Sequence, residues 1–544
     1  MTDQNQTTET DWWKGAVIYQ IYPRSFLDTT GNGVGDLCGI TEKMDYIASL
    51  GVDAVWISPF VKSPMLDFGY DVSDYLAVDP LFGGLEDFRE LLDAAHERGL
   101  KVIMDQVFSH TSDQHPWFLE SRERRDNPKS DWYVWADGKP DGTPPNNWLS
   151  VFGGSSWQWE PRRGQYYLHN FLRQMPDLNY HCAEVQEAIL DASRFWLDLG
   201  VDGFRLDVCT FYAHDLELRD NPPNPHVPRG EAFRFNPYSK QIHQYDIVRP
   251  ETVKFLERLR ALCDGYDNRA LLGELNESDA VRVHREYTAI RRLQLAYGYW
   301  LLGAHEITPS LLREVAADLG HADDSGWPCW ALDNHDFARA VTRLGAEPNP
   351  DLVTVILAAL ATMRGAMCLY QGSELGLPEA EVPYDRLSDP YGREFWPAYK
   401  GRDGARTPMP WKVEAEHAGF SAVEPWLPVT PAHRDLAVDG QDALPGSTLN
   451  RMRRFLGWRR DIAPIRRGGM EFVDTSAEVL AFRRALDGET VTCAFNFSEH
   501  EVVLDMPEAE TGPAMEGHGF GAARHGDKVY LPGYGAFFAC ENAP

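Results

Sequence analysis

GFRLDV (residues 203–208) is a short apolar run that ends in acidic residue Asp207, and three other stretches of the chain have the same form. KVIMDQ carries Asp105, ALLGEL carries Glu274 and CWALDNHD ends at Asp336. Barrels of alternating strands and helices place their chemistry at the C-terminal ends of parallel strands. Carboxylates at such ends are therefore expected to meet in one pocket, although they lie far apart in the sequence.

Eight buried runs with helical patterns between them predict the fold. The runs lie at 16–23, 53–59, 101–108, 202–208, 269–275, 293–297, 327–335 and 366–372. Their nearly continuous apolar character is typical of parallel strands that are buried on both faces. Between them, stretches such as 85–100 and 185–200 have apolar residues at helical spacing. This alternation predicts an α/β fold, a (β/α)8 TIM barrel.

Two connections between these runs are too long for turns. The first is rich in Trp, Pro, Gly and Asn and predicts a small inserted domain after the third strand. The second, at about 209–250, is expected to wall the pocket. After about residue 460 the pattern changes to alternating runs separated by turns, which predicts a C-terminal antiparallel β-domain. The predicted domains are the barrel at 1–108 and 177–459, the insert at 109–176 and the β-domain at 460–544.

The charge of the chain argues against two classes of partner. The net charge of −30, from 52 basic and 82 acidic residues, would repel phosphate backbones and anionic lipid. We therefore expect no nucleic acid and no membrane partner. The N-terminal segment lacks the basic and apolar parts of a secretory signal, and the most apolar stretch, 352–363, is too short to cross a bilayer. A cytoplasmic monomer or homodimer is expected.

Paired acids at strand ends suit the cleavage of a glycosidic bond with retention. One carboxylate attacks the anomeric carbon, and a second carboxylic acid about 5 to 5.5 Å away protonates the departing oxygen. Acids at these positions in barrels also bind metal ions or pair with Arg and Lys. A barrel enzyme with a catalytic divalent metal, such as an aldolase or an enolase-like lyase, is therefore a rival interpretation.

Six motifs in order resemble those of glycoside hydrolase family 13, the α-amylase family. GFRLDV, LLGEL, DNHD and DQVFSH resemble the four characteristic stretches of that family. The YQIYPRSF opening and the MPDLN stretch extend the resemblance over essentially the whole chain. The resemblance implies a TIM barrel enzyme that acts on α-glucosides.

The resemblance also gives the acids different roles. Asp207 corresponds to the nucleophile, Glu274 to the acid/base and Asp336 to the carboxylate that binds sugar hydroxyls and helps to distort the ring. His110 and His335 resemble the two histidines that hydrogen-bond hydroxyls of the reacting sugar. No cofactor is expected for the chemistry.

Elementary electrostatics is consistent with this division. Arg205 lies two residues before Asp207 on the same strand face, so its charge is expected to keep that carboxylate ionised. Glu274 must begin protonated, which predicts an apolar or anion-flanked surrounding.

The GYDVSDY segment (69–75), with Asp67 before it, resembles the exo-acting α-glucosidases and oligo-1,6-glucosidases. In those enzymes an Asp at the position of Asp67 and an Arg in the motif seen here as GRDGARTPMPW, Arg402, bind the nonreducing terminal glucose. Tyr70 is expected to stack on that glucose, with Phe152 beside it. The expected substrate-binding residues are Asp67, Tyr70, His110, Phe152, Arg205, His335 and Arg402.

The resemblance implies a retaining exo-α-glucosidase with a covalent β-glucosyl-aspartate intermediate and transfer to small hydroxyl acceptors. Val208 resembles the oligo-1,6-glucosidase pattern, whereas the stretches at 236–246 and 105–118 resemble transferring bacterial α-glucosidases, so the linkage stays open, with α-1,4 favoured. Isomerising and transferring relatives, including sucrose isomerase and trehalose synthase, share the intermediate and form the alternative. A noncatalytic scaffold is disfavoured, because such relatives carry a membrane anchor and have lost catalytic acids.

One loop departs from the family pattern. DTTGNGVGD (28–36) lies where relatives carry a Ca2+ or Mg2+ loop, but Thr30 replaces an Asn and Asn32 replaces an Asp. Losing one negative charge should weaken binding of a hard cation. The sequence predicts a structural Ca2+ or Mg2+ site with Asp28, Asn32 and Asp36 as ligands.

Overall fold

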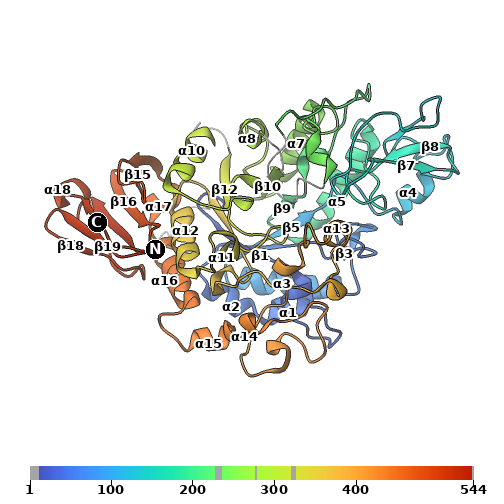
Figure 1. The fold of residues 1–544 in the computed structure, drawn as a ribbon. Coiled ribbons are helices and arrows are strands. Elements are labelled where there is room, and N and C mark those ends of the chain that lie inside the picture. The colour runs from blue at the N-terminus through green and yellow to red at the C-terminus, as the bar shows by residue number, and fades with distance from the viewer. Residues whose placement is uncertain (1–10, 227–235, 276–278, 320–325, 542–544) are drawn as a thin grey trace, which may run out of the picture.

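The computed structural model of the chain describes residues 11–226, 236–275, 279–319 and 326–541. Within these residues, eight parallel strands close into a barrel (Figure 1). In barrel order they are β1 (Val17–Ile21), β13 (Ala366–Tyr370), β12 (Trp327–Ala331), β11 (Leu295–Gly298), β10 (Ala270–Leu275), β9 (Gly203–Leu206), β5 (Lys101–Gln106) and β2 (Ala54–Ile57). Seven of the eight predicted runs contain one of these strands and the run at 293–297 overlaps β11, so the predicted barrel is confirmed.

Helices cover the outside of the barrel and bury one face against it (Figure 1). In α3 (Leu85–Glu97), the buried residues Phe88, Leu91, Leu92 and Ala95 recur at helical spacing. The other longer helices are α5 (Ala183–Leu199), α7 (Pro250–Cys263), α8 (Ala280–Tyr287), α10 (Pro309–Leu319), α12 (Pro350–Thr362) and α16 (Thr448–Arg460). The short helices of the barrel region are α1 (Leu37–Glu42), α2 (Met44–Ser49), α9 (Tyr299–Leu302), α11 (Ala340–Arg343) and α17 (Ala463–Arg467).

Long connections leave the C-terminal ends of four strands, and one of them joins β9 to α7. After β5 come α4 (Pro116–Ser121) and an antiparallel sheet with the order β6 (Trp135–Ala136), β8 (Gln165–Leu168), β7 (Trp157–Glu160). After β2 comes the hairpin β3 (Val61–Lys62) and β4 (Asp74–Val78). After β13 an irregular segment runs to α16 and contains α13 (Pro390–Phe395), α14 (Pro431–Asp435) and α15 (Val438–Asp442). The predicted boundaries of the inserted domain, 109–176, stay a prediction.

The C-terminal part forms two antiparallel sheets, as predicted. One has the order β14 (Gly469–Val473), β15 (Val479–Leu486), β16 (Glu489–Asn496), β20 (Ala536–Glu541), and the other β17 (Val502–Asp505), β19 (Lys528–Leu531), β18 (Ala523–His525). A short helix, α18 (Glu508–Thr511), follows β17. In Figure 1 these sheets and the sheet after β5 lie on opposite sides of the barrel.

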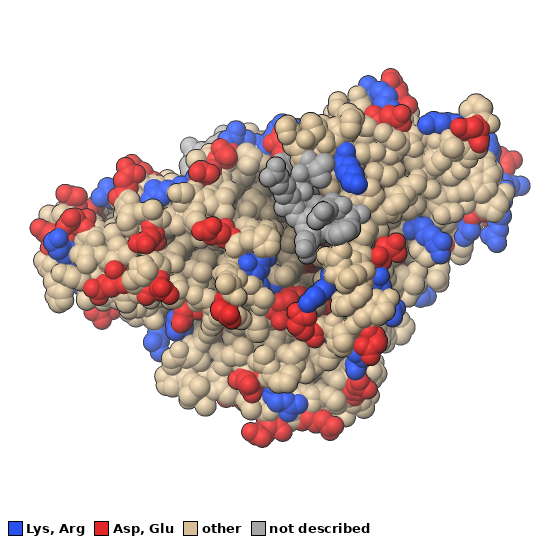
Figure 2. All heavy atoms as spheres, in the orientation of Figure 1, with Lys and Arg blue, Asp and Glu red and all other residues tan. Residues whose placement is uncertain are grey.

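The surface carries charges of both signs. On the face that Figure 2 shows, acidic and basic side chains are interspersed and separated by neutral residues. Among the helices of the described residues, none is long and apolar enough to span a membrane.

Candidate active site

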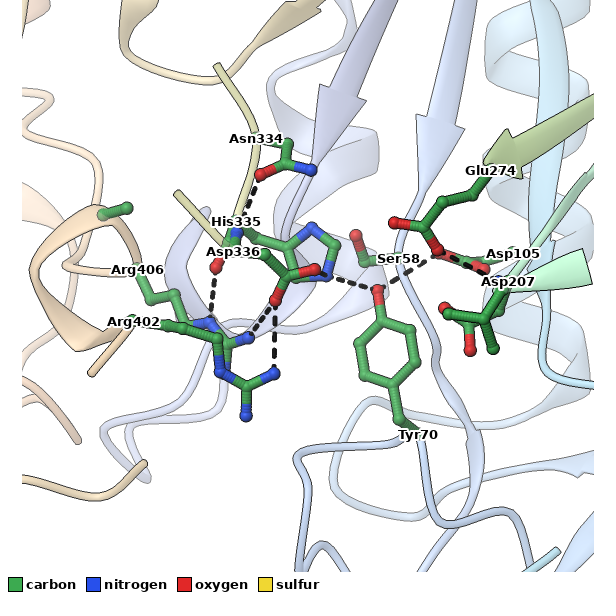
Figure 3. A network of polar contacts seen from close by, with 12 residues as sticks. Ser58, Tyr70, Asp105, Asp207, Glu274, Asn334, His335, Asp336, Arg402 and Arg406 are labelled. Atoms are coloured by element: carbon green, nitrogen blue, oxygen red, sulfur yellow. Dashed lines mark hydrogen bonds and ion pairs between the residues drawn. The ribbon is translucent and has the colours of Figure 1, made fainter. Parts of the chain in front are cut away.

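The four strand-end acids meet at one end of the barrel (Figure 3). Asp105 lies within β5 and Glu274 within β10, while Asp207 directly follows β9 and Asp336 lies in the loop after β12. Because β5, β9 and β10 are neighbours in the barrel, their C-terminal ends place three of these carboxylates side by side.

One fully buried guanidinium, that of Arg205, binds three of the carboxylates. Its Nη1 donates to Asp105 Oδ1 at 2.8 Å and to Asp207 Oδ1 at 2.6 Å, and its Nη2 donates to Glu274 Oε2 at 2.6 Å. The Asp207 and Glu274 carboxylates therefore face a single guanidinium from two adjacent strands. We call Arg205, Asp105, Asp207 and Glu274 the acid cluster.

The backbone beside Asp207 also binds Glu274. Val208 adopts a left-handed conformation (φ 34°, ψ 49°), which is uncommon for a β-branched residue and costs about 1 to 3 kcal/mol. In this conformation its N–H donates to Glu274 Oε2 at 3.0 Å. Glu274 Oε2 thus accepts from both Arg205 and Val208, and Tyr299 donates to its other oxygen at 3.4 Å; the apolar or anion-flanked surrounding expected for Glu274 stays a prediction.

The acid cluster has more acids than its one guanidinium can balance. Burial raises the pKa of Asp207 well above its usual range; Arg205 opposes the rise, while Glu274 and Asp105 add to it. Burial raises the pKa of Asp105 to about 6 against the same arginine. This differs from the expectation that Arg205 keeps Asp207 ionised, because the arginine is shared among three carboxylates. The cluster is therefore suited to hold and release a proton.

A second cluster lies beside the first and contains two arginines. Arg402 Nη2 donates to Asp67 Oδ1 and to Asp389 Oδ1, both at 2.7 Å, and its Nη1 donates to Asp336 Oδ1 at 3.2 Å. Arg406 Nη2 donates to the same Asp336 oxygen at 2.8 Å. We call these five residues the arginine pair cluster. It brings the predicted Asp67, Asp336 and Arg402 together.

The charges around this second cluster keep Asp336 and Asp389 ionised. Burial alone would raise the pKa of Asp336, but His335, Arg402 and Arg406 hold it well below its usual range. Burial would likewise raise the pKa of Asp389, but the charge of Arg402 outweighs burial and lowers this pKa. A permanent charge at Asp336 suits binding of sugar hydroxyls rather than proton transfer.

Tyr70 and His335 stand between the two clusters (Figure 3). The Tyr70 hydroxyl lies 2.6 Å from His335 Nε2 and donates to Asp105 Oδ2 at 3.3 Å, and the two rings stack with their centroids 5.3 Å apart. Burial lowers the pKa of His335 to about 3, so this ring is neutral at ordinary pH. Stacking of Tyr70 on glucose stays a prediction.

The two remaining predicted binding residues, His110 and Phe152, each contact another residue of the site. His110 Nε2 is 3.0 Å from the Tyr70 carbonyl oxygen, and its Nδ1 is 2.8 Å from Ser109 Oγ. It therefore contacts the backbone that carries Tyr70. Phe152 packs 5.3 Å from the Arg402 guanidinium.

Sequence reasoning missed Asp389, Arg406 and Tyr391. Arg406 belongs to the GRDGARTPMPW motif, so the motif itself offered a signal. Asp389 precedes Pro390 in an Asp-Pro pair that is typical of a helix start, and its side chain caps α13 by accepting from the Tyr391 N–H at 3.2 Å. Nothing in the sequence pattern indicated that it also binds Arg402.

The predicted metal ligands already have donors from the chain. Asp28 accepts from the N–H groups of Gly31 and Gly33 at 2.8 Å, and Asp36 caps α1 by accepting from the Gly39 N–H at 2.7 Å. Asn32 Oδ1 accepts from the Val34 N–H at 2.8 Å. No group of three His, Cys, Asp or Glu side chains in the described part of the chain could hold a metal ion. This arrangement does not fit a formed cation site, and the metal stays a prediction.

Comparison with known proteins agrees with this geometry. The family model for the alpha amylase catalytic domain matches residues 20–468, and that for the maltogenic amylase C-terminal domain matches 470–538. The chain is 50% identical to a probable alpha-glucosidase of Rhizobium meliloti, over 98% of this chain and 99% of that protein. It is 36% identical to the oligo-1,6-glucosidase of Heyndrickxia coagulans, over 92% and 94% of the two proteins.

Solved structures of similar proteins have the same fold. The structure of an alpha-glucosyl transfer enzyme superposes with a TM-score of 0.94 at 53% identity, over 98% of this chain and 99% of that one. The trehalulose synthase of Pseudomonas mesoacidophila superposes with a TM-score of 0.87 at 32% identity, over 97% and 99% of the two chains.

Proposed function

Because the chain belongs to the α-amylase family, we propose that it is a retaining exo-α-glucosidase that releases the nonreducing terminal glucose from short α-glucosides and also transfers it to small hydroxyl acceptors. The observation that carries this proposal is the shared guanidinium of Arg205. It holds the Asp207 and Glu274 carboxylates together at the ends of adjacent strands.

Asp207 and Glu274 act in two steps. In the first, Asp207 attacks the anomeric carbon while the Glu274 carboxylic acid protonates the departing oxygen, which leaves a glucosyl ester on Asp207. In the second, the Glu274 carboxylate takes a proton from water or from an acceptor hydroxyl, whose oxygen displaces Asp207. Asp207 is joined to Arg205 through Oδ1, which leaves Oδ2 as the attacking oxygen.

The arginine pair cluster supports exo action. Asp67, Arg402 and Asp389 form a buried chain of charge pairs beside Asp336. Such a charged wall suits a site that ends at one sugar unit, because its carboxylates can accept hydrogen bonds from the hydroxyls of a terminal glucose. The reaction itself needs no cofactor in this proposal.

A transferase or sucrose isomerase of the same family is the second candidate. It is favoured by the likeness to an alpha-glucosyl transfer enzyme and to a trehalulose synthase. These activities share the glucosyl ester and differ in the hydroxyl that takes the glucosyl group.

Product analysis distinguishes these functions. The purified protein is incubated with maltose, isomaltose, sucrose and starch, and the products and their anomeric configuration are followed by NMR. We expect α-glucose from the short α-glucosides, with α-1,4 favoured, and transfer products when acceptor is abundant. Random long fragments from starch with no action on maltose would refute the proposal. Isomers of sucrose as the main product would favour the second candidate.

A further inference from the structure

Three long connections meet at the side chain of Asn236. This residue lies in the connection between β9 and α7 and is 5% exposed. Its Nδ2 donates to the Val151 carbonyl oxygen in the segment after β5 at 2.6 Å, and to the Tyr391 hydroxyl in the segment after β13 at 3.0 Å. Its Oδ1 accepts from the Tyr238 N–H at 3.0 Å, which fixes the amide in this orientation.

The groups that Asn236 binds are coupled to Arg402. Val151 precedes Phe152, whose ring stacks on Tyr391 with centroids 5.1 Å apart and lies 5.3 Å from the Arg402 guanidinium. Asp389 adds a second link, because one of its oxygens accepts from both the Tyr391 N–H and the Arg402 guanidinium. The aromatic pair Phe152–Tyr391 is thus held between Asn236 and the arginine pair cluster.

We propose that Asn236 is a positioning residue that holds the aromatic pair against Arg402, and that it thereby sets the share of glucosyl groups passed to a sugar acceptor rather than to water. The inference rests on the proposed function, because it concerns the fate of the glucosyl ester on Asp207. In both fates the ester bond breaks, the anomeric carbon bonds to a new oxygen, and the proton of that oxygen goes to Glu274.

The physical reason is the chemistry of the pair. Two stacked rings form an apolar surface beside the site of the terminal glucose, and they keep water away from the charges next to them. Without the Asn236 amide, the Val151 carbonyl oxygen and the Tyr391 hydroxyl each lose their hydrogen bond to it, so the aromatic pair can separate and admit water. The partition between transfer and hydrolysis then moves toward hydrolysis.

The chain offers a matched control in Asn146. Asn146 is 6% exposed. Its Oδ1 accepts from the Trp148 N–H, two residues later, and its Nδ2 donates to the Leu218 carbonyl oxygen at 3.1 Å. Asn146 therefore joins the segment after β5 to the connection between β9 and α7, as Asn236 does through Val151. Unlike Asn236, it binds neither member of the aromatic pair.

The test compares Asn236→Ala, Tyr391→Phe and Asn146→Ala with the wild type, with maltose as donor and acceptor. The ratio of transfer product to released glucose is measured at one maltose concentration, with KM and kcat alongside. In Asn236→Ala we expect this ratio to fall about fivefold, the change that one net hydrogen bond produces. Tyr391→Phe keeps the ring but loses the hydroxyl, so the ratio should fall in the same direction. Asn146→Ala should keep the wild-type ratio.

The outcomes separate the inference from the function on which it rests. A wild-type ratio in Tyr391→Phe and in folded Asn236→Ala, or an equal fall in Asn146→Ala, would overturn the inference. If Asn236→Ala does not fold, the ratio in Tyr391→Phe is compared with the ratio in Asn146→Ala, and this comparison tests the inference. A wild type that leaves maltose intact would instead refute the proposed function.

Discussion

The two charge clusters of the site each contain three acids, but one has a single arginine and the other has two. The acid cluster consists of Arg205 with Asp105, Asp207 and Glu274. The arginine pair cluster consists of Arg402 and Arg406 with Asp67, Asp336 and Asp389. Tyr70 and His335 separate them.

This difference in balance assigns different tasks to similar side chains. In the acid cluster, burial and mutual repulsion outweigh one guanidinium, and the pKa of Asp207 rises. In the arginine pair cluster, His335 and two guanidinium groups outweigh burial, and the pKa of Asp336 falls. Proton transfer therefore belongs to the first cluster and permanent charge to the second.

Replacing Arg205 by Lys should have the largest effect on this comparison. A single ammonium cannot match the fork that binds three carboxylates from two terminal nitrogens. We expect kcat to fall about a hundredfold or more, because a fixed donor among the reacting groups is lost. Steady-state kinetics on maltose measures this, with the circular dichroism spectrum as the control for folding. An unchanged kcat would contradict the role given to the shared guanidinium.

Arg402→Lys should act on binding more than on chemistry. The Arg402 guanidinium contacts Asp67, Asp336 and Asp389 but none of the acid cluster. We expect KM for maltose to rise about tenfold, the cost of one charge-assisted hydrogen bond, while kcat changes less. If kcat fell as far as in Arg205→Lys, the two clusters would not have separate tasks.

The pH dependence of kcat/KM should shift when an acid of the acid cluster is replaced, but not when an acid of the arginine pair cluster is replaced. Asp207 must be ionised to attack, so activity should fall as the pH falls through its raised pKa. Asp105→Asn removes a neighbouring negative charge that raises this pKa, so the acid limb of kcat/KM should move to lower pH. Asp389→Asn should leave the limb in place. His335 does not set this limb, because its pKa is lowered to about 3.

The smallest effect is expected from a chelator. Arginine side chains bind the carboxylates of both clusters, so exhaustive treatment with EDTA should leave kcat/KM on maltose unchanged. Loss of turnover that a divalent cation restores would favour the metal-dependent barrel enzyme. A lower melting temperature with unchanged turnover would instead indicate a structural cation, as the sequence predicted near Asp28 and Asp36.

Regular elements were predictable because their physical signals are local. A parallel strand such as β9 is buried on both faces and is therefore apolar throughout, and an acid at its end is visible in the sequence. The convergence of Asp105, Asp207 and Glu274 followed from the barrel alone. The raised pKa values of Asp105 and Asp207 did not, because they depend on how many acids share Arg205.

Irregular segments were not predictable in the same way. Asp389 and Tyr391 lie in the connection after β13, where no apolar period repeats. Their contacts with Arg402 and Asn236 depend on how three connections pack together, which no short stretch of sequence encodes. The connection at about 209–250 is expected to wall the pocket, but residues 227–235 lie outside the described part of the chain. Asn236, the next described residue, donates to the Tyr391 hydroxyl of the aromatic pair.

The most direct test of the account traps the glucosyl ester. Glu274→Gln is mixed with an activated α-glucosyl donor whose leaving group needs no proton, and the digested protein is analysed by mass spectrometry. Attack by Asp207 can then proceed, whereas release lacks its base. We predict a glucosyl group on the peptide that contains Asp207, and no such group in the double variant with Asp207→Asn. Wild-type turnover in Glu274→Gln, or a glucosyl group on another residue, would contradict the account.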